Sequence, residues 1–203
     1  MGYCDGLIKQ DITTDCENPI VPGIEKEGVI VNRQDIDFAA TVFETGVGAR
    51  SNVIATLGLK SGKKGFKVIV PTKQPFNGTG TAMEEGTNRN TFTNTLGLVI
   101  LANDPDVCEN IIDGLATGEY VCLLENKYKN INKATNPGDS SFQIYGYYQG
   151  LKATTLENEK YSEDTEGGWN IVLTETKSPK SGLFYFKTDL ATTRESLATL
   201  TAP

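Results

Sequence analysis

The stretch FQIYGYY, residues 142–148, decides the fold class, because its side chains alternate along an extended chain. In a β-strand successive side chains point to opposite faces of the sheet. One face of this stretch would carry Phe142, Ile144, Gly146 and Tyr148, and the opposite face would carry Gln143, Tyr145 and Tyr147. We therefore predict a strand with aromatic residues on both faces.

Segments of similar character lie on either side of this stretch, separated by turn-forming clusters such as 46–48 and 61–65. β-branched and aromatic residues favour strands, whereas glycine and serine favour turns. Within 169–174, one face carries Trp169, Ile171 and Leu173. The spacing is typical of sandwiches and barrels, so we predict a mainly β fold, a β-sandwich or barrel. The predicted strands are 29–31, 38–43, 52–57, 66–70, 96–101, 120–125, 142–148, 169–174 and 184–186.

One segment carries a clear helix start. Asp104 is suited to the N-cap, Pro105 to the first helical position and Asp106 to the first turn. An apolar stripe follows at helical spacing and should pack on the sheet. We predict a flanking α-helix at about 105–116 and a C-terminal helix at about 191–200. The stripe consists of Val107, Ile111, Ile112 and Leu115.

Two segments lack any sustained period. Residues 1–27 are predicted to form an extended N-terminal arm, and residues 71–94, rich in Thr, Asn and Gly, a long inter-strand loop. The rest, 28–203, is predicted to be a single β-rich domain. Both segments are candidates for contacts with another subunit, because they carry apolar residues outside any periodic element. The candidate contact residues are Ile8, Ile12, Ile20, Phe76 and Phe92, with Glu84 and Glu85 as candidate acidic residues of a lumen or surface.

Composition excludes several classes of function. The 203 residues contain no histidine, so Ser-His-Asp and Cys-His catalysis are both excluded. The net charge of −7 argues against tight binding to nucleic acid phosphates. No apolar run is long enough to span a bilayer, and the first residues do not resemble a signal peptide. We expect a non-enzymatic protein without catalytic residues, metal, cofactor or membrane anchor, synthesised in the cytoplasm.

Partial motifs do not change that expectation. Residues 58–64 resemble a phosphate-binding loop, but the glycine spacing is short by one, and residues 46–51 fit a turn better than a dinucleotide site. The acidic loops 157–159 and 163–166 lack the pattern of a calcium loop. The cysteines match no zinc or redox spacing. We expect Cys108 and Cys122 in the core, while pairing of Cys4 with Cys16 stays open.

The C-terminal half carries a family resemblance. Residues 142–153 (FQIYGYYQGLKA), an acidic loop, residues 167–173 (GGWNIVL) and residues 183–186 (LFYF) resemble virion structural proteins of tailed phages of Bacteroidales-type hosts, in particular their tail tube subunits. The N-terminal CDGLI at 4–8 and the turn at 22–25 are similar as well.

The resemblance implies a β-sandwich or barrel subunit that assembles into rings, hexameric in this family, which stack axially into a hollow tail tube. Strands of neighbouring subunits would pair edge to edge, other tail proteins would be partners, and phage DNA would pass through an acidic lumen without tight binding. The protein would reside in the virion tail after synthesis in the host bacterium. Two alternatives stay open. They are another virion component, such as a capsid decoration or head-tail connector protein, and a carbohydrate-binding β-sandwich that uses Trp169, Tyr145, Tyr147 and Tyr148.

Overall fold

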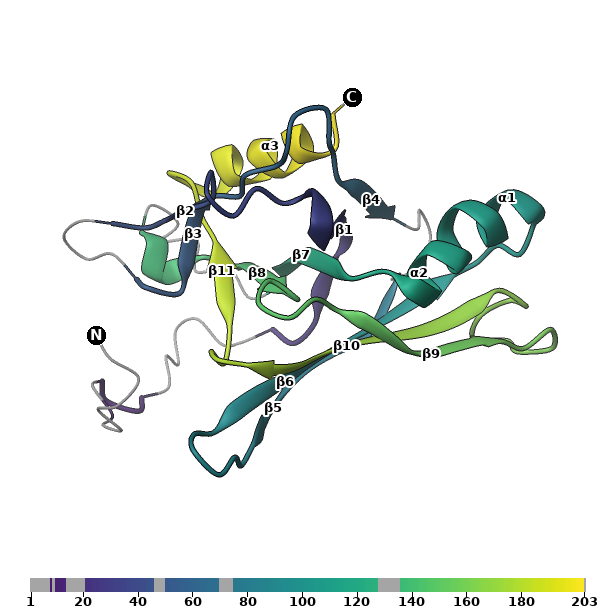
Figure 1. Ribbon diagram of the computed structural model, residues 1–203, viewed down its shortest axis with the longest axis horizontal. Helices are drawn as coiled ribbons and strands as arrows, with labels where there is room; N and C mark the ends of the chain where they lie inside the picture. The colour runs from purple at the N-terminus through teal and green to yellow at the C-terminus, as the bar shows by residue number, and fades with distance from the viewer. Residues whose placement is uncertain are drawn as a thin grey trace.

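The protein is mainly β, with two packed sheets and two flanking helical segments (Figure 1). The structure is a computed structural model of the chain, and it describes residues 8, 10–13, 21–45, 50–69, 75–127 and 136–202. The predicted fold class, a β-sandwich with a flanking helix, is confirmed. None of the helices in these ranges is long and apolar enough to cross a membrane.

The larger sheet has seven strands in the order β2-β3-β11-β8-β7-β1-β4. All neighbours are antiparallel except β11 and β3, which run parallel. The strands are β1 (Ile24–Asn32), β2 (Val42–Phe43), β3 (Val53–Thr56), β4 (Phe66–Ile69), β7 (Tyr120–Asn126), β8 (Phe142–Tyr145) and β11 (Leu183–Tyr185).

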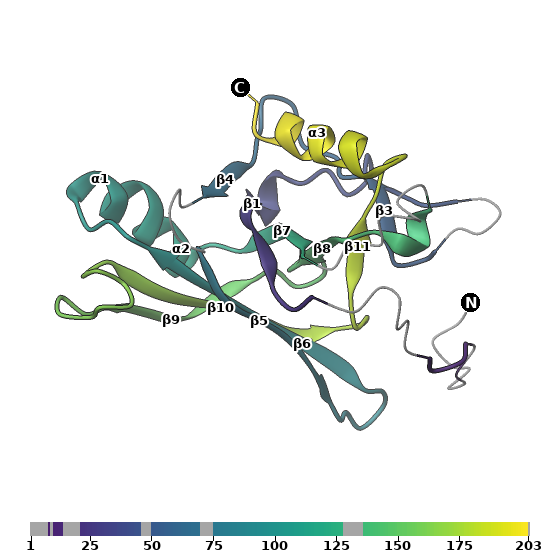
Figure 2. The same ribbon diagram turned by 180° about the vertical axis from the view of Figure 1, so that it is seen from behind.

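The smaller sheet has four strands in the order β5-β6-β10-β9, and every pair in it is antiparallel. Its strands are β5 (Phe76–Glu84), β6 (Thr91–Ile100), β9 (Lys152–Asn158) and β10 (Trp169–Ser178). The chain crosses from the larger to the smaller sheet between β8 and β9. Figures 1 and 2 show the larger sheet lying over one face of the smaller one.

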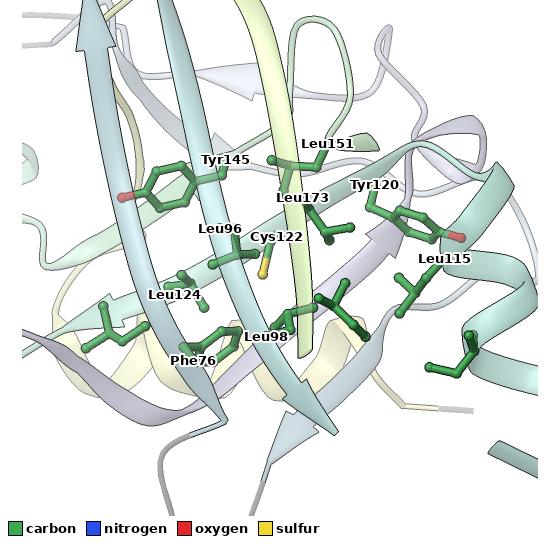
Figure 3. Close-up of a cluster of buried hydrophobic side chains, with 13 residues drawn as sticks. Phe76, Leu96, Leu98, Leu115, Tyr120, Cys122, Leu124, Tyr145, Leu151 and Leu173 are labelled. Carbon is green, nitrogen blue, oxygen red and sulfur yellow. The ribbon is translucent and has the colours of Figure 1, made fainter. Parts of the chain in front are cut away.

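β7 explains how the layers are held together, because its side chains alternate between two apolar clusters. Tyr120, Cys122 and Leu124 enter the cluster between the two sheets (Figure 3), whereas Val121 and Leu123 enter the cluster on the other face of the larger sheet. A strand that is buried on both faces has a nearly continuous apolar sequence, and residues 120–124 have such a sequence. The second cluster is covered by helix α3 (Leu190–Leu200), which contributes Leu190, Leu197 and Leu200.

A helix that packs against the first cluster consists of α1 (Pro105–Val107), the π-helical turn η2 (Cys108–Ile112) and α2 (Asp113–Thr117). The predicted cap is confirmed, since the Asp104 carboxylate accepts hydrogen bonds from the amides of residues 106 and 107. Ile112 and Leu115 are buried. The prediction for Ile111 was wrong, because it is 42% exposed. A π turn adds one residue per turn and so rotates the buried face away from a regular helical stripe.

Residues 71–94 do not form the long loop that we predicted. From Phe76 onward this segment is strand β5, which pairs with β6 in a hairpin, and residues 71–74 lie outside the described ranges. The periodicity was hidden because the residues of β5 that point toward the larger sheet include Thr79 and Thr81 instead of apolar side chains. Pairing with β6, and not a local pattern, makes this segment a strand.

Further elements differ from the sequence predictions. β1 begins at Ile24, so the arm is shorter than 1–27. In the predicted strand 38–43 only Val42–Phe43 is extended, because the Asp37 carboxylate accepts from the amides of Ala39 and Ala40 and holds a turn. The predicted strand 142–148 ends at Tyr145, and β9 was missed altogether.

Candidate functional site

The residues proposed from the sequence as subunit contacts do not form one surface. Ile8 and Ile12 are 79% and 89% exposed, while Ile20 lies outside the described residues. Phe76 is only 4% exposed and packs in the cluster between the sheets, so its side chain is committed to this chain's own core. Phe92 is half-buried on β6, opposite Met83 of β5.

β5 is the feature that a single chain leaves unexplained. Among the described strands it pairs with β6 alone, so its other edge is open. Phe76 is buried, and every other residue of the strand is exposed. Residues 77–83 (NGTGTAM) contain no charge and no proline, which are the usual devices that keep an edge strand from pairing with another chain. Such an edge favours the addition of a further strand.

Two glycines in β5 bear on whether another strand could pair with its open edge. A Cβ atom added at Gly78 or at Gly80 would meet nothing within 4 Å, and neither glycine has a positive φ. Glycine in a strand weakens the strand and often marks a place where another backbone approaches closely. Gly78 follows a bulge in the pairing of β5 with β6, which gives it a role within the chain. Gly80 has no such role within the described residues, and the space beside it is open.

Because Gly80 is not needed for the fold, replacing it should not harm the isolated chain. We expect Gly80→Thr to raise the free energy of unfolding by about 0.5–1 kcal/mol, since threonine favours strands and glycine does not. The measurement is urea unfolding at a protein concentration too low for association. A loss of stability would show that the monomer itself requires glycine here.

β9 forms the opposite edge of the same sheet, and its only described strand partner is β10. Its two charged residues lie near its ends. Lys152 at the start forms a 2.8 Å ion pair with Glu119, and Glu157 lies near the far end. Residues 153–156 (ATTL) between them are uncharged. The smaller sheet therefore has two open edges with uncharged middle sections.

The face of the smaller sheet that points away from the larger sheet is also unusual. On it, Asn77 donates to Asn170 at 2.9 Å, and the hydroxyls of Thr154 and Thr174 lie 3.1 Å apart. Glu84 lies at one margin of this face, where it accepts a hydrogen bond from Thr93, and Glu85 is exposed just beyond it. Thus one of the acidic residues predicted from the sequence lies on this face, at its edge.

The opposite face of the same sheet contains a buried carboxylate that sequence reasoning missed. Glu175 is 1% exposed. Its Oε1 atom accepts from the amides of Tyr148 and Gln149 at 3.0 and 2.9 Å. Its Oε2 atom accepts from the Gly146 amide at 3.0 Å and from the Asn94 side chain at 2.8 Å. These four bonds tie β6 and β10 to the turn that leads into β9, which gives Glu175 a structural task.

A signal in the sequence could have revealed Glu175. It continues the alternation of Trp169, Ile171 and Leu173, which face the larger sheet as predicted. A carboxylate at the next inward position of a buried strand must be hydrogen-bonded, because burial of an unpaired charge is very costly. The predicted strand 169–174 stopped one residue short of it.

A groove of about 600 Å³ lies between α3 and the β1 and β7 strands. An ion pair is at its side, because the Arg194 guanidinium donates to both oxygens of Glu125 at 3.0 and 2.6 Å. This pairing raises the pKa of Arg194 and attaches α3 to β7. The groove's floor includes Val29, Phe142 and Leu197. The Arg194–Glu125 pair thus has a structural role at this groove.

Two of the four aromatic residues named for the carbohydrate-binding alternative are buried. Tyr145 and Tyr147 are 5% and 7% exposed, and Tyr147 packs edge to face against Phe38 and Phe43 at centroid distances of 5.4 and 5.9 Å. The indole of Trp169 is half-buried and donates to Asn103 at 3.2 Å. Tyr145 and Tyr147 therefore serve the core, while Trp169 and Tyr148 are half-buried.

The remaining motifs fall in ordinary structural places. The segment 58–64 leads through a turn into β4, without the helix that a phosphate-binding loop requires. Burial raises the pKa of the Cys122 thiol, while Cys108 is half-buried, and Cys4 and Cys16 lie outside the described residues. In the described part of the chain no three His, Cys, Asp or Glu residues group in a way that could hold a metal ion.

The candidate site is therefore the smaller sheet, whose outer strands β5 and β9 each have a strand partner on one side only, with an exposed face between them. Comparison of the chain with protein-family models, curated proteins and solved structures finds no match.

Proposed function

We propose that this protein is a self-assembling structural subunit of a virion, and specifically the subunit of a phage tail tube. The observation that carries the self-assembly is the open β5 edge, with seven consecutive uncharged residues and open space beside Gly80. The resemblance of residues 142–186 to tail tube subunits supports the more specific assignment. The role is structural, without catalysis or cofactor.

The strand directions support a ring that closes through β5 and β9. The smaller sheet has an even number of strands, four, and all its neighbours are antiparallel. The two edge strands therefore run in opposite directions. If the next copy is related by rotation about an axis roughly along the strands, its β5 lies beside β9 of the first copy in an antiparallel arrangement. One continuous antiparallel sheet results, in a head-to-tail contact that can close into a ring.

The offset between the two edges fits a closed cylinder. Gly80 is paired across the sheet with Thr95, Thr95 with Thr174, and Thr174 with Lys152, so these four residues lie in one row. From this row β5 continues to Glu84, whereas β9 continues in the opposite direction to Asn158. For β5 of one copy to pair along the whole of β9 in the next copy, the two copies must be displaced along the strands by about three residues, or ~10 Å. Each copy contributes a width of ~19 Å across its four strands. This corresponds to a strand tilt of about 30°, close to the tilt of roughly 35–45° in closed barrels.

The ring size follows from the resemblance, which implies six copies. Six four-stranded sheets would form a cylinder of 24 strands. Barrels of about 16–18 strands already leave an aqueous channel, so a cylinder of this size would enclose a wide one. Such a ring, stacked on others, is suited to the passage of phage DNA.

The test combines electron microscopy with two matched double variants. Purified protein is expected to form rings or stacked tubes in negative stain. Gly80→Lys with Ala82→Lys adds two charges to the open edge at exposed positions, and should raise the concentration needed for half-assembly at least about tenfold, because lysine protects edges from pairing. Sedimentation velocity measures this concentration.

The control carries the same two charges elsewhere. Ala116→Lys with Thr117→Lys places them on exposed positions at the end of α2, where lysine suits the helix dipole. It should assemble like the unmodified protein, and both variants should keep its circular dichroism spectrum. A monomer at high concentration, or equal assembly of the edge and control variants, would contradict the proposal.

A further inference from the structure

We propose that successive rings are joined through the larger sheet, with strand β4 of a subunit in one ring paired to strand β2 of a subunit in the next ring. This inference rests on the proposed function, because it takes the ring and its axial stacking as given. It goes beyond that function by naming the two strands that form the contact between rings.

The two strands are the outer strands of the larger sheet, and among the described strands each has a partner on one side only. Both carry exposed apolar side chains, since Phe66 and Ile69 of β4 and Val42 of β2 are each about half exposed. Their charges are opposite, with Lys67 within β4 and Glu44 directly after β2. A lysine discourages indiscriminate pairing of an outer strand, but it favours a partner strand that brings a carboxylate.

The single parallel pair in the larger sheet gives its outer strands opposite directions. In a sheet of seven strands that were antiparallel throughout, the two outer strands would run the same way. Here β3 and β11 run parallel and all other neighbours are antiparallel, so β2 and β4 run in opposite directions. A copy displaced along the strand order, without being turned over, therefore brings its β2 beside β4 in the more stable antiparallel arrangement.

The strand order of the larger sheet runs along the strands of the smaller sheet. Phe76, at the start of β5, lies beside Gly28 of β1. Three residues later, Thr79 interacts with Tyr145 of β8. Three residues of a strand span ~10 Å, which equals the distance from β1 across β7 to β8 at ~4.8 Å per strand. Figures 1 and 2 agree, because β3 and β4 lie on opposite sides of β7 along the long axis of the molecule.

This crossing of the two sheets decides where the outer strands lie in a ring. The axis of the β5–β9 ring runs roughly along the strands of the smaller sheet. The larger sheet therefore presents β2 toward one end of the ring and β4 toward the other. A second ring stacked in the same orientation places its β2 strands against the β4 strands of the first. The larger sheets then continue from ring to ring in a head-to-tail contact.

The dimensions of the two sheets agree with this contact. β6 and β10 have ten residues each, so the wall of the ring is ~33 Å high along its strands. The seven strands of the larger sheet advance it by ~34 Å for each copy, at ~4.8 Å per strand. Pairing of β4 with β2 thus lets the inner walls of successive rings meet end to end. A strand tilt of about 30° shortens both lengths equally, to roughly 30 Å.

The first experiment changes one residue on each outer strand and measures rings and stacks in negative stain. Val42→Lys brings a second lysine to the contact with Lys67, and Ile69→Glu brings a second carboxylate to the contact with Glu44. We expect each variant to form single rings and to lose at least about tenfold in mean stack length, because like charges across paired strands repel each other. The rings themselves show that each variant has folded.

The double variant that combines Val42→Lys with Ile69→Glu should regain at least about half of the stack length of the unmodified protein, because the two new charges attract each other. Rescue requires that the positions meet between copies, since within one chain they lie at opposite edges of the sheet. Ala116→Lys with Thr117→Lys is the control and should stack normally. Normal stacks in both single variants, or no rescue, would overturn the inference, whereas absence of rings in the unmodified protein overturns the proposed function instead.

The second experiment measures the rise per ring by cryo-electron microscopy of the unmodified tubes. We expect a rise of about 30–34 Å, set by seven strand spacings of the larger sheet. A rise larger by one strand spacing, ~5 Å, would leave β4 and β2 too far apart to pair, and would overturn the inference even if the rings themselves are intact.

Discussion

Replacing Glu175 with glutamine is expected to lower the free energy of unfolding by about 2–5 kcal/mol. The carboxylate accepts four hydrogen bonds in a site that is 1% exposed. An amide side chain has one oxygen and one NH2 group, so two of the donors would face another donor. Each buried donor without a partner costs about 1–3 kcal/mol.

Urea unfolding of dilute protein measures this loss, with Glu157→Gln as the matched control. Glu157 is exposed on the same sheet, so its replacement should change the free energy of unfolding by less than about 0.5 kcal/mol. Hydrogen exchange adds a local readout, because the amides of Tyr148 and Gln149 should lose protection in the Glu175 variant. Equal effects of the two substitutions would show that the buried hydrogen bonds of Glu175 contribute no more to the free energy of unfolding than an exposed carboxylate does.

The second large effect is expected at Gly146, where the chain leaves β8. Its φ is +85°, and a Cβ atom there would lie 2.3 Å from the backbone oxygen of Tyr120. Gly146→Ala should therefore cost about 3 kcal/mol or more, since the strain of a positive φ adds to a clash with backbone that cannot move freely.

Gly62 offers a control that separates these two causes. It also has a positive φ, +72°, but an added Cβ would meet nothing within 4 Å. Gly62→Ala should thus show only the conformational cost, about 1 kcal/mol. Thermal and urea unfolding of both variants provide the comparison. If the two alanines cost the same, the contact of Gly146 with Tyr120 is not what fixes this turn.

Both substitutions act on the same junction. Gly146 begins the turn whose amides bind Glu175, and Gly150 ends it with a φ of +82°. Through this turn the chain passes from the larger sheet to the smaller one. The position of β9, and therefore of one edge of the smaller sheet, depends on it.

Much of the fold could be predicted from local pattern. β7 reads as a continuous apolar run because both its faces are buried, and Asp104 with Pro105 marks a helix start because capping is a property of neighbouring residues. The residues of β10 that face the larger sheet could be predicted for the same reason. Elements that are stabilised by their own side chains can be predicted from the sequence.

β5 and Glu175 could not be predicted that way. β5 has glycine and threonine where an amphipathic strand would have apolar residues, and only pairing with β6 makes it extended. Glu175 looks like a surface acid until the turn at 146–149 surrounds it with donors. In both cases the stabilising partner is distant in the sequence, so it cannot be predicted from the local composition.

The sequence by itself determined the fold class, the main strands, the capped helix and the absence of imidazole chemistry, because these depend on residue type and short-range spacing. The tertiary structure alone decided which strands end a sheet and which face stays uncovered. Those properties arise from long-range pairing, so β5, which resembled a loop in the sequence, is an edge strand in which only Phe76 is buried.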